Sequence, residues 1–328
     1  MLASVRFAVR SFARRPSIAI VAVVSLAIGI GVNSAVFGIV DAFLRPPAVE
    51  HPEGLVTVSG SFRDSGDTVI SWPDYQDIAS QIGAFPELAA FSQRGALYRD
   101  GDDVIQLPLT VVSDNYFSVL GVRPALGRFP EPGYNYDSDP TPPITISHSF
   151  WRKRLGGRAD VIGQSVELTK KLFRVAAVLP PEFRGFSPVM TVEIWMPVGA
   201  WTKNGKEELQ RGNGQFEAIG RLRAGISLQQ AQAGLDPLAK RIEQTDSRVP
   251  RGRRLVAQSL GDQLHSRTRP GLLVLAAVAL VLLTACANVA GVLLAHAESR
   301  RREIGIRMAI GASRGALARQ FLDRKSVV

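Results

Sequence analysis

The side chains that commonly perform catalysis or bind metals are few and scattered in this sequence of 328 residues. It has one cysteine, Cys286, and four histidines, His51, His148, His265 and His296, none at metal-ligand spacing. It contains no phosphate-binding loop G-x-x-x-x-G-K-[ST], no G-x-S-x-G and no H-E-x-x-H. Its serine, histidine and aspartate residues show no spacing that suggests a triad. These absences predict a protein that is not an enzyme, with no ATPase motif, no metal and no cofactor.

Three aspartates, Asp100, Asp102 and Asp103, are close enough in sequence to be considered as calcium ligands. Their spacing does not complete a calcium-binding loop, whereas aspartate and glycine together are common in tight turns. We therefore expect a solvated turn here, joining strands around 97–98 and 104–112 in a hairpin.

The formal net charge of +10 is concentrated at the two ends of the chain. Four arginines precede the first apolar segment, and residues 296–328 carry eight basic and three acidic side chains. A nucleic-acid-binding domain would distribute its basic residues over a folded face, interleaved with aromatic or polar residues. Here the basic residues flank long apolar segments, which is typical of a membrane protein and predicts no nucleic-acid partner.

Two uncharged segments are long enough to cross a bilayer. Residues 17–40 form a run of 24 and residues 271–295 a run of 25 without a charge. A helix of this length covers ~36 Å, against ~30 Å for the hydrocarbon core. A cleaved signal peptide is the alternative for the first segment, but the apolar part of a signal peptide is only ~7–15 residues long. The sequence predicts transmembrane helices over 17–43 and 270–296, with no charge in their cores and hence no ion pathway.

The basic residues also predict the orientation of the chain. Arginines before the first span and at 300–302 place both termini of a multi-pass protein in the cytoplasm, which makes residues 45–269 periplasmic or extracellular. Arg267 and Arg269 argue against this orientation, but long loops cross the membrane largely regardless of charge. The expected organisation is a cytoplasmic segment 1–16, a helix 17–43, an external domain 44–269, a helix 270–296 and a cytoplasmic segment 297–328.

Small and polar residues within the two spans suggest helix packing. Ala27, Gly31 and Ala35 recur every fourth residue and would form a small-residue stripe, although lipid-exposed small residues are nearly as common. Asn33 and Asn288 are polar residues within the apolar segments, and each could hydrogen-bond across a helix interface.

Two amphipathic helices are expected in the external segment. The first, over 71–82, opens with a capping box from Ser71 to Asp74. The second, over 227–244, has apolar residues at helical spacing and contains Pro237, which can kink it.

Short β-rich runs between glycine and proline residues make up the rest of the external segment. Residues 166–178 alternate and predict a second hairpin that turns at Lys170 and Lys171. The loop 130–143, rich in proline, tyrosine and aspartate, is expected to be exposed and mobile. Segregated strands and helices of this kind predict an α+β domain rather than a nucleotide-binding βαβ array.

Several motifs, taken in order along the chain, resemble those of the MacB/FtsX-like ABC transporter permeases, especially the duplicated orphan permeases. Each is weak alone, but their joint order is specific and covers essentially the whole chain. In the spans and tails they are RRP (14–16), SLAIGIGVNSAVFGIVDAFLRP (25–46) and LLTACANVAGVLLAHAESRRREIGIRMAIGASRGALARQFL (282–322). In the external segment they are DNYFSVLGVRPALGR (114–128), FWRKRLGGRADVIGQSVEL (150–168), VLPPEF (178–183) and IGRLRAGISLQQAQ (219–232).

The resemblance implies an α+β membrane protein in which two transmembrane helices flank a MacB-like periplasmic core domain. That domain would have a porter-like subdomain, from roughly 52–112 and 213–262, and an inserted β-rich sabre-like subdomain. The chain would be a permease subunit in the bacterial inner membrane that transmits motion driven by a separate ABC ATPase. The implied partners are that ATPase, a second permease copy or half, and membrane lipids; the substrate is not implied.

The same resemblance makes 297–328 the start of the FtsX-like permease domain, with a coupling helix from Ser299 to Leu322 that lies along the membrane and docks on the ATPase. Glu303 resembles a fixed glutamate of the family. A purely topological role for the arginines is the alternative. The residues expected to couple to the ATPase are Arg300, Arg301, Arg302, Glu303, Gly305, Arg307, Gly311, Ala312 and Arg314.

Two further expectations concern the length and the function of the chain. The family unit has four membrane helices, and the resemblance stops in DRKSVV (323–328), so we expect a C-terminally truncated fragment rather than a true two-helix protein. The alternative functions are an FtsX-like scaffold or regulator of a cell-wall enzyme, and a two-helix sensor with an external ligand domain. A neighbouring ATPase gene would favour the permease, and a neighbouring cell-wall hydrolase gene the regulator.

Overall fold

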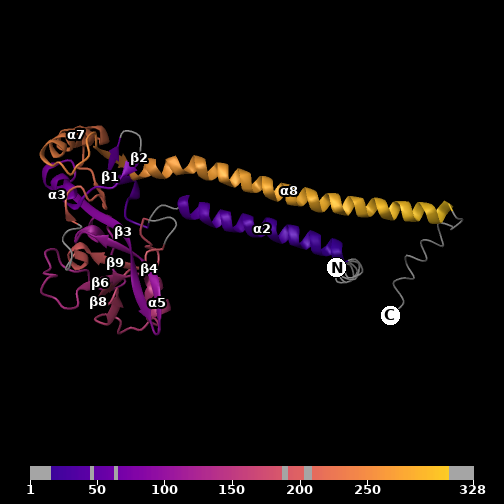
Figure 1. The fold of residues 1–328 in the computed structure, drawn as a ribbon, viewed down its shortest axis with the longest axis horizontal. Coiled ribbons are helices and arrows are strands. Elements are labelled where there is room, and N and C mark those ends of the chain that lie inside the picture. Colours follow the sequence, from indigo (N-terminus) through magenta and orange to yellow (C-terminus); the bar gives the residue numbers. More distant parts are fainter. Residues whose placement is uncertain (1–15, 45–47, 63–65, 187–190, 203–208, 310–328) are drawn as a thin grey trace. The chain divides into compact units, whose positions relative to one another are not determined.

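The computed structural model describes residues 16–44, 48–62, 66–186, 191–202 and 209–309 (Figure 1). The chain divides into two compact units. One consists of Met1–Asp41 and Pro270–Val328, and the other of Ala42–Arg269. The first unit holds most of two long helices, and the second holds every strand that the structure describes.

The two long helices are α2 (Pro16–Leu44) and α8 (Leu260–Ala309). Among the described residues, Leu272–Gly291 is the one helical segment long and apolar enough to cross a membrane; α2 contributes a shorter apolar segment, Val23–Gly38. α8 extends beyond the predicted segment 270–296 at both ends. On the C-terminal side, the sequence AESRRREIGIRMA (297–309) is rich in alanine, arginine and glutamate, which are good helix formers, so the helical backbone continues past the apolar core.

The second unit is built on one sheet whose main path is β11-β1-β10-β3-β4-β9-β6-β8-β5. Off this path, β2 pairs with β1, and β7 pairs with β3 and β8. The strands are β1 (Leu55–Phe62), β2 (Gly66–Thr68), β3 (Glu87–Asp100), β4 (Asp103–Val112), β5 (Leu126–Gly127), β6 (Pro143–Ile146), β7 (Ser165–Leu168), β8 (Lys171–Val178), β9 (Ile194–Pro197), β10 (Glu217–Arg221) and β11 (Arg254–Ser259).

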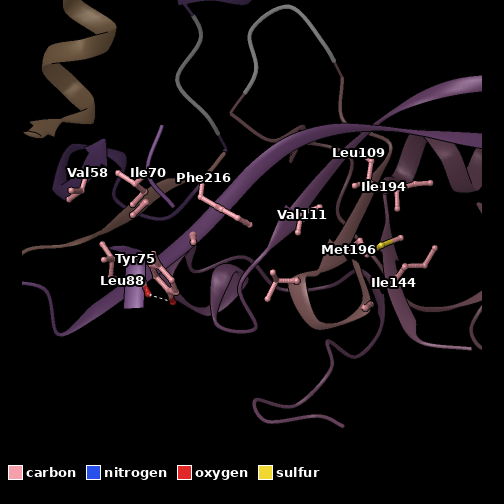
Figure 2. Close-up of a cluster of buried hydrophobic side chains, with 14 of the residues drawn as sticks. Val58, Ile70, Tyr75, Leu88, Leu109, Val111, Ile144, Ile194, Met196 and Phe216 are labelled. Atoms are coloured by element: carbon pink, nitrogen blue, oxygen red, sulfur yellow. Dashed lines mark hydrogen bonds between the residues drawn. The ribbon is translucent and has the colours of Figure 1, made fainter. Parts of the chain in front are cut away.

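Four strands and two helices form a split βαβ arrangement with strand order β11-β1-β10-β3. Helix α3 (Trp72–Gln81) precedes β3, and helix α7 (Leu228–Thr245) connects β10 to β11. Because β10 pairs antiparallel with both β1 and β3, strands from the two ends of the external segment alternate in one sheet. Both helices bury apolar side chains in the cluster on one face of this sheet. Figure 2 shows Tyr75 of α3 there, donating its hydroxyl to the Leu88 carbonyl at 3.2 Å.

The remaining strands connect the two strands of the long β3–β4 hairpin through a series of pairings. β4 pairs with β9, β9 with β6, β6 with β8, β8 with β7 and β7 with β3, so six strands form a closed circuit. Tyr98 of β3 packs edge-on against Phe150 of α5 (His148–Arg154), with ring centroids 5.1 Å apart. Val166, Leu168 and Phe173 are buried in the same cluster. The separation of strands and helices confirms an α+β domain.

Both predicted helices of the external segment are confirmed. In α3, the Ser71 amide donates to Asp74 Oδ2 at 2.9 Å and the Asp74 amide donates to Ser71 Oγ at 3.3 Å. In α7, Ser227 and Gln230 form a second capping box. The helix continues through Pro237 without ending, as predicted, because the flanking turns bury an apolar face against the sheet.

The predicted hairpins are present with shifted limits. β3 begins at Glu87, earlier than expected, because its first half pairs with β10, a strand far along the sequence. The second hairpin turns at Thr169 and Lys170 instead of Lys170 and Lys171, with φ of 49° and 64° at the two turn residues. A two-residue turn with positive φ at both positions matches the twist of the paired strands.

The loop 130–143 makes specific contacts with the rest of the domain, and its mobility stays a prediction. Arg174 of β8 forms an ion pair with Asp139 and donates to the Tyr134 hydroxyl at 3.0 Å. The ring of Tyr136 is buried, and its hydroxyl donates to Asp114 Oδ1 at 3.0 Å. The sequence pattern missed these contacts because the partners lie outside the loop.

Candidate functional site

The first candidate site is the contact between α2 and α8. A Cβ atom at Gly29 would lie 3.2 Å from the Cβ of Ala285 and 3.6 Å from Leu282 Cδ1, so the absence of a side chain lets the two helices approach closely. The less exposed side chains of each helix recur at helical spacing. In the apolar parts they include Ser25, Gly29, Asn33, Val36 and Val40 on α2, and Leu275, Val278, Leu282, Ala285 and Val289 on α8.

The predicted small-residue stripe lies outside this contact. Ala27, Gly31 and Ala35 are exposed, and a Cβ at Gly31 would meet nothing within 4 Å. The α2–α8 contact uses Gly29 instead of the stripe. Packing of the stripe against a helix of another chain or segment stays a prediction.

The two asparagines differ in their surroundings. Asn33 is half-buried on the contact face, and its Nδ2 donates to the Gly29 carbonyl of its own helix at 2.8 Å. Asn288 is exposed on α8. The structure therefore shows a bond within α2 at Asn33 where the sequence suggested a bond across the interface.

The predicted coupling segment continues α8 and does not start a new helix at Ser299. α8 has no break before Ala309, so the described part of the segment extends the same helix, and the prediction of a separate helix along the membrane is corrected up to that residue. Arg301, Arg302 and Gly305 are exposed. The backbones of Arg300, Glu303 and Arg307 are helical, and Gly311, Ala312 and Arg314 lie outside the described residues.

The second candidate site lies in the external unit, where the chain enters and leaves it. β1, the first strand after α2, pairs antiparallel with β11, the last strand before α8, over six residue pairs from Val56↔Ser259 to Ser61↔Arg254. Gln263, in the first turns of α8, donates to Thr57 Oγ1 of β1 at 2.8 Å. The first and the last strand of the external unit are therefore hydrogen-bonded neighbours.

A compact aromatic cluster lies on the sheet face opposite α3 and α7. It includes Leu260, the first residue of α8, and the short helix α4 (Tyr116–Leu120). Phe117 stacks on Phe129 with centroids 4.2 Å apart, and Trp195 is fully buried beside them. Burial raises the pKa of Tyr116 far above its ordinary value, so this phenol is neutral.

The strongest charge network of the external unit is structural. Asp74 is fully buried; its Oδ1 lies 2.7 Å from Arg211 Nη1 and its Oδ2 lies 2.7 Å from Arg253 Nη2. Burial acts to raise the pKa of Asp74, but Arg253 and the hydrogen bonds from Ser71 outweigh it and hold the pKa below its ordinary value. The network joins α3 to segments before β10 and before β11, and so ties the two ends of the external segment together.

The acidic residues of the predicted turn were also considered as metal ligands. No group of three or more histidine, cysteine, aspartate or glutamate side chains is placed to hold a metal in the part of the chain that the structure describes. Asp100 pairs with Arg154, while Asp102 and Asp103 are exposed around a two-residue turn. This is the solvated turn that the sequence predicted.

Two family models match the chain. The MacB-like periplasmic core domain matches residues 19–238, and the FtsX-like permease C-terminal model matches residues 275–323. The chain therefore belongs to the MacB/FtsX-like ABC transporter permeases. Members of this family work with ABC ATPase partners, and the match makes this chain an inner-membrane protein with a periplasmic domain.

Curated relatives are similar over most of this chain. The macrolide export ATP-binding/permease protein MacB of Neisseria meningitidis (serogroup A, strain Z2491) is 25% identical over 267 residues, which are 80% of this chain and 39% of that protein. MacB of Shewanella sp. (strain W3-18-1) is 24% identical over 68% of this chain and 33% of its own length. The chain thus spans about two fifths or less of these relatives. Their names include an ATP-binding part, whereas the segments matched here are a periplasmic core domain and a permease segment.

Solved structures with a similar arrangement include the periplasmic region of MacB from Actinobacillus actinomycetemcomitans. It covers 65% of this chain and 92% of its own, with a TM-score of 0.49 and 12% identity. A domain of a putative permease from Porphyromonas gingivalis covers 64% of this chain with a TM-score of 0.48 and 18% identity.

Proposed function

We propose that this chain is the permease subunit of an efflux or extrusion system, and that it transmits motion driven by a cytoplasmic ABC ATPase to its periplasmic domain. The observation that supports this most directly is the continuity of α8. It begins at Leu260, immediately after β11, and runs to Ala309 in the basic segment. At ~1.5 Å per residue this helix is ~75 Å long, well beyond the ~30 Å of a hydrocarbon core. A single helix of that length can relay displacement without an intervening loop.

The proposed topology has two membrane spans, α2 and α8, with both termini in the cytoplasm. Leu272–Gly291 supports the second span by length and composition, and the contact at Gly29 supports α2 as its neighbour. The basic residues at both chain ends favour the cytoplasmic side for both. In the proposed assembly, the exposed stripe on α2 packs against a second permease copy. The exposed side chains of Arg301 and Arg302 bind lipid head groups or the ATPase.

The proposal is tested by co-expressing the chain with the ABC ATPase encoded in the same locus and reconstituting both in lipid nanodiscs. We expect the ATPase to co-purify and its ATP hydrolysis to depend on the chain. Glu303→Lys should abolish this dependence while preserving topology, since it strengthens the positive charge on the cytoplasmic side. Glu298→Lys, at an exposed acid of the same helix, is the matched control and should leave it intact. An ATPase that neither binds nor responds to the chain would refute the proposal.

The FtsX-like match over 275–323 also supports the regulator of a cell-wall enzyme as a second function. The same reconstitution separates the two, because a regulator would retain a hydrolase on its periplasmic domain. Co-purification of a cell-wall hydrolase, with no transported compound, would favour the regulator.

A further inference from the structure

The chain makes a strained turn between α2 and β1. His51 has φ 48° and ψ 63°, in the left-handed region that side chains with a Cβ rarely occupy. A short 3-10 helix, η1 (Pro52–Gly54), follows, and β1 starts directly after it at Leu55. Such a conformation persists only where surrounding groups hold it.

Arg221, the last residue of β10, holds this turn from one side. Its Nη1 donates to the His51 carbonyl at 2.9 Å, and its Nη2 donates to the Glu50 carbonyl. Two donors from one planar guanidinium fix two successive carbonyls, an arrangement that lysine cannot reproduce. Arg221 also lies opposite Leu55 in the β1–β10 ladder, so the clamp is built on the strand that pairs with the one following the turn.

Helix α4 holds the turn from the other side. The Glu50 amide donates to the Leu120 carbonyl at 3.2 Å. Gly121, which ends α4, has φ 68°, and a Cβ there would lie 2.8 Å from the Glu50 Cβ. Any side chain at Gly121 would therefore displace Glu50 as well as strain the backbone.

The same short helix belongs to a cluster that also includes a residue from the other end of the domain. Leu120 is fully buried in the aromatic cluster that also contains Leu260, the first residue of α8. The segment that follows α2 is thus hydrogen-bonded to α4, and the residue that starts α8 belongs to the same apolar cluster as α4.

We propose that Arg221 and α4 form the junction through which displacement of the α2 side of the chain reaches β10 and the start of α8. Arg221 is a positioning residue in this scheme, since it acts through the carbonyls of Glu50 and His51. The inference rests on the proposed transmission of motion and adds the residues that perform it in the periplasmic domain.

The structural part is tested by hydrogen–deuterium exchange on the full chain in nanodiscs. In Arg221→Gln, we expect the amides of residues 50–55 to exchange about tenfold faster than in the wild type, as the clamp is lost. Arg221→Lys should fall between the two. Arg223→Gln, which changes an exposed arginine of the next segment, is the matched control and should exchange like the wild type. Equal exchange in Arg221→Gln and the wild type would overturn the inference.

The functional part uses the reconstituted ATPase. Arg221→Gln should retain ATPase binding but lose the dependence of ATP hydrolysis on the chain, with an unchanged unfolding midpoint. If this variant loosens residues 50–55 and still stimulates like the wild type, the junction is overturned and the permease proposal stands. If the wild-type chain itself fails to bind the ATPase, the proposed function fails, and the transmission inference fails with it.

Discussion

Val56 lies directly opposite Ser259 in the antiparallel ladder between β1 and β11. Val56 is the second residue of the strand that follows α2, and Ser259 is the last residue before α8. The strand that follows one apolar helix and the strand that precedes the other are therefore paired in one hydrogen-bonded ladder. In a domain that responds to the movement of helices, this pairing makes β1 and β11 move together.

The first prediction concerns topology. In a Cys286→Ala background, single cysteines at Ser138 and Ser313 should behave oppositely in intact cells. Ser138→Cys lies in the exposed loop of the periplasmic domain and should react with an impermeant thiol reagent. Ser313→Cys lies in the basic segment beyond α8 and should be protected until the membrane is permeabilised. Protection of both positions, or labelling of both, contradicts two spans with cytoplasmic termini.

The second prediction concerns the helix contact. Gly29→Leu should lower the stability of the protein by about 1–3 kcal/mol, because a side chain at this point overlaps Ala285 and Leu282. Gly31→Leu, two residues along the same helix, meets no neighbour in this chain and should be tolerated. Thermal unfolding in detergent compares the two variants. Equal destabilisation would show that the α2–α8 contact does not depend on Gly29.

The stripe on α2 illustrates what the sequence could and could not predict. Local signals were sufficient for α3 and α7, because capping boxes and apolar spacing are encoded within each helix. They were insufficient for the packing face of α2. Gly29 and Gly31 both belong to small-residue series with a spacing of four, and the two series lie about 200° apart around the helix. Only the partner helix decides which series is used.

The clamp at Arg221 was missed for a different reason. Arg221 and Glu50 are 171 positions apart, and although Arg221 lies in the motif 219–232, nothing in that motif points to residues 50 and 51. A side chain that binds backbone carbonyls requires no particular residue type at the position it binds, because every residue has a carbonyl. The sequence therefore gives no signal of such a contact. The positive φ at His51 likewise depends on tertiary contacts, since histidine is not a usual turn signal.

The third prediction concerns the buried charge network. Asp74→Asn keeps a capping oxygen but removes the charge beside Arg253, whose side chain is only 8% exposed. Breaking one partner of a buried pair leaves the other unpaired, so we expect a loss of roughly 3–5 kcal/mol in the free energy of unfolding. Asp160→Asn breaks the exposed pair with Arg158 and should have no measurable effect. Denaturant unfolding followed by tryptophan fluorescence makes the comparison, and similar effects of the two variants would contradict a structural role for Asp74.

The last prediction is the pH dependence of the loop 130–143. Partial burial acts to raise the pKa of Asp139, but hydrogen bonds from Tyr134 and Arg174 outweigh it and hold the pKa at about 2. A carboxyl whose pKa is lower in the folded state stabilises the fold above its unfolded pKa, near ~3.9, and this contribution is lost as the pH falls toward 2. Asp139→Asn should therefore cost about 1–2 kcal/mol at pH 6, from the loss of its charged hydrogen bonds, and progressively less as the pH falls from 4 to 2. Unfolding midpoints of the wild type and Asp139→Asn, measured between pH 2 and pH 6, test this prediction. If the difference between the two midpoints does not vary with pH, the charge of the Asp139 carboxylate does not hold the loop.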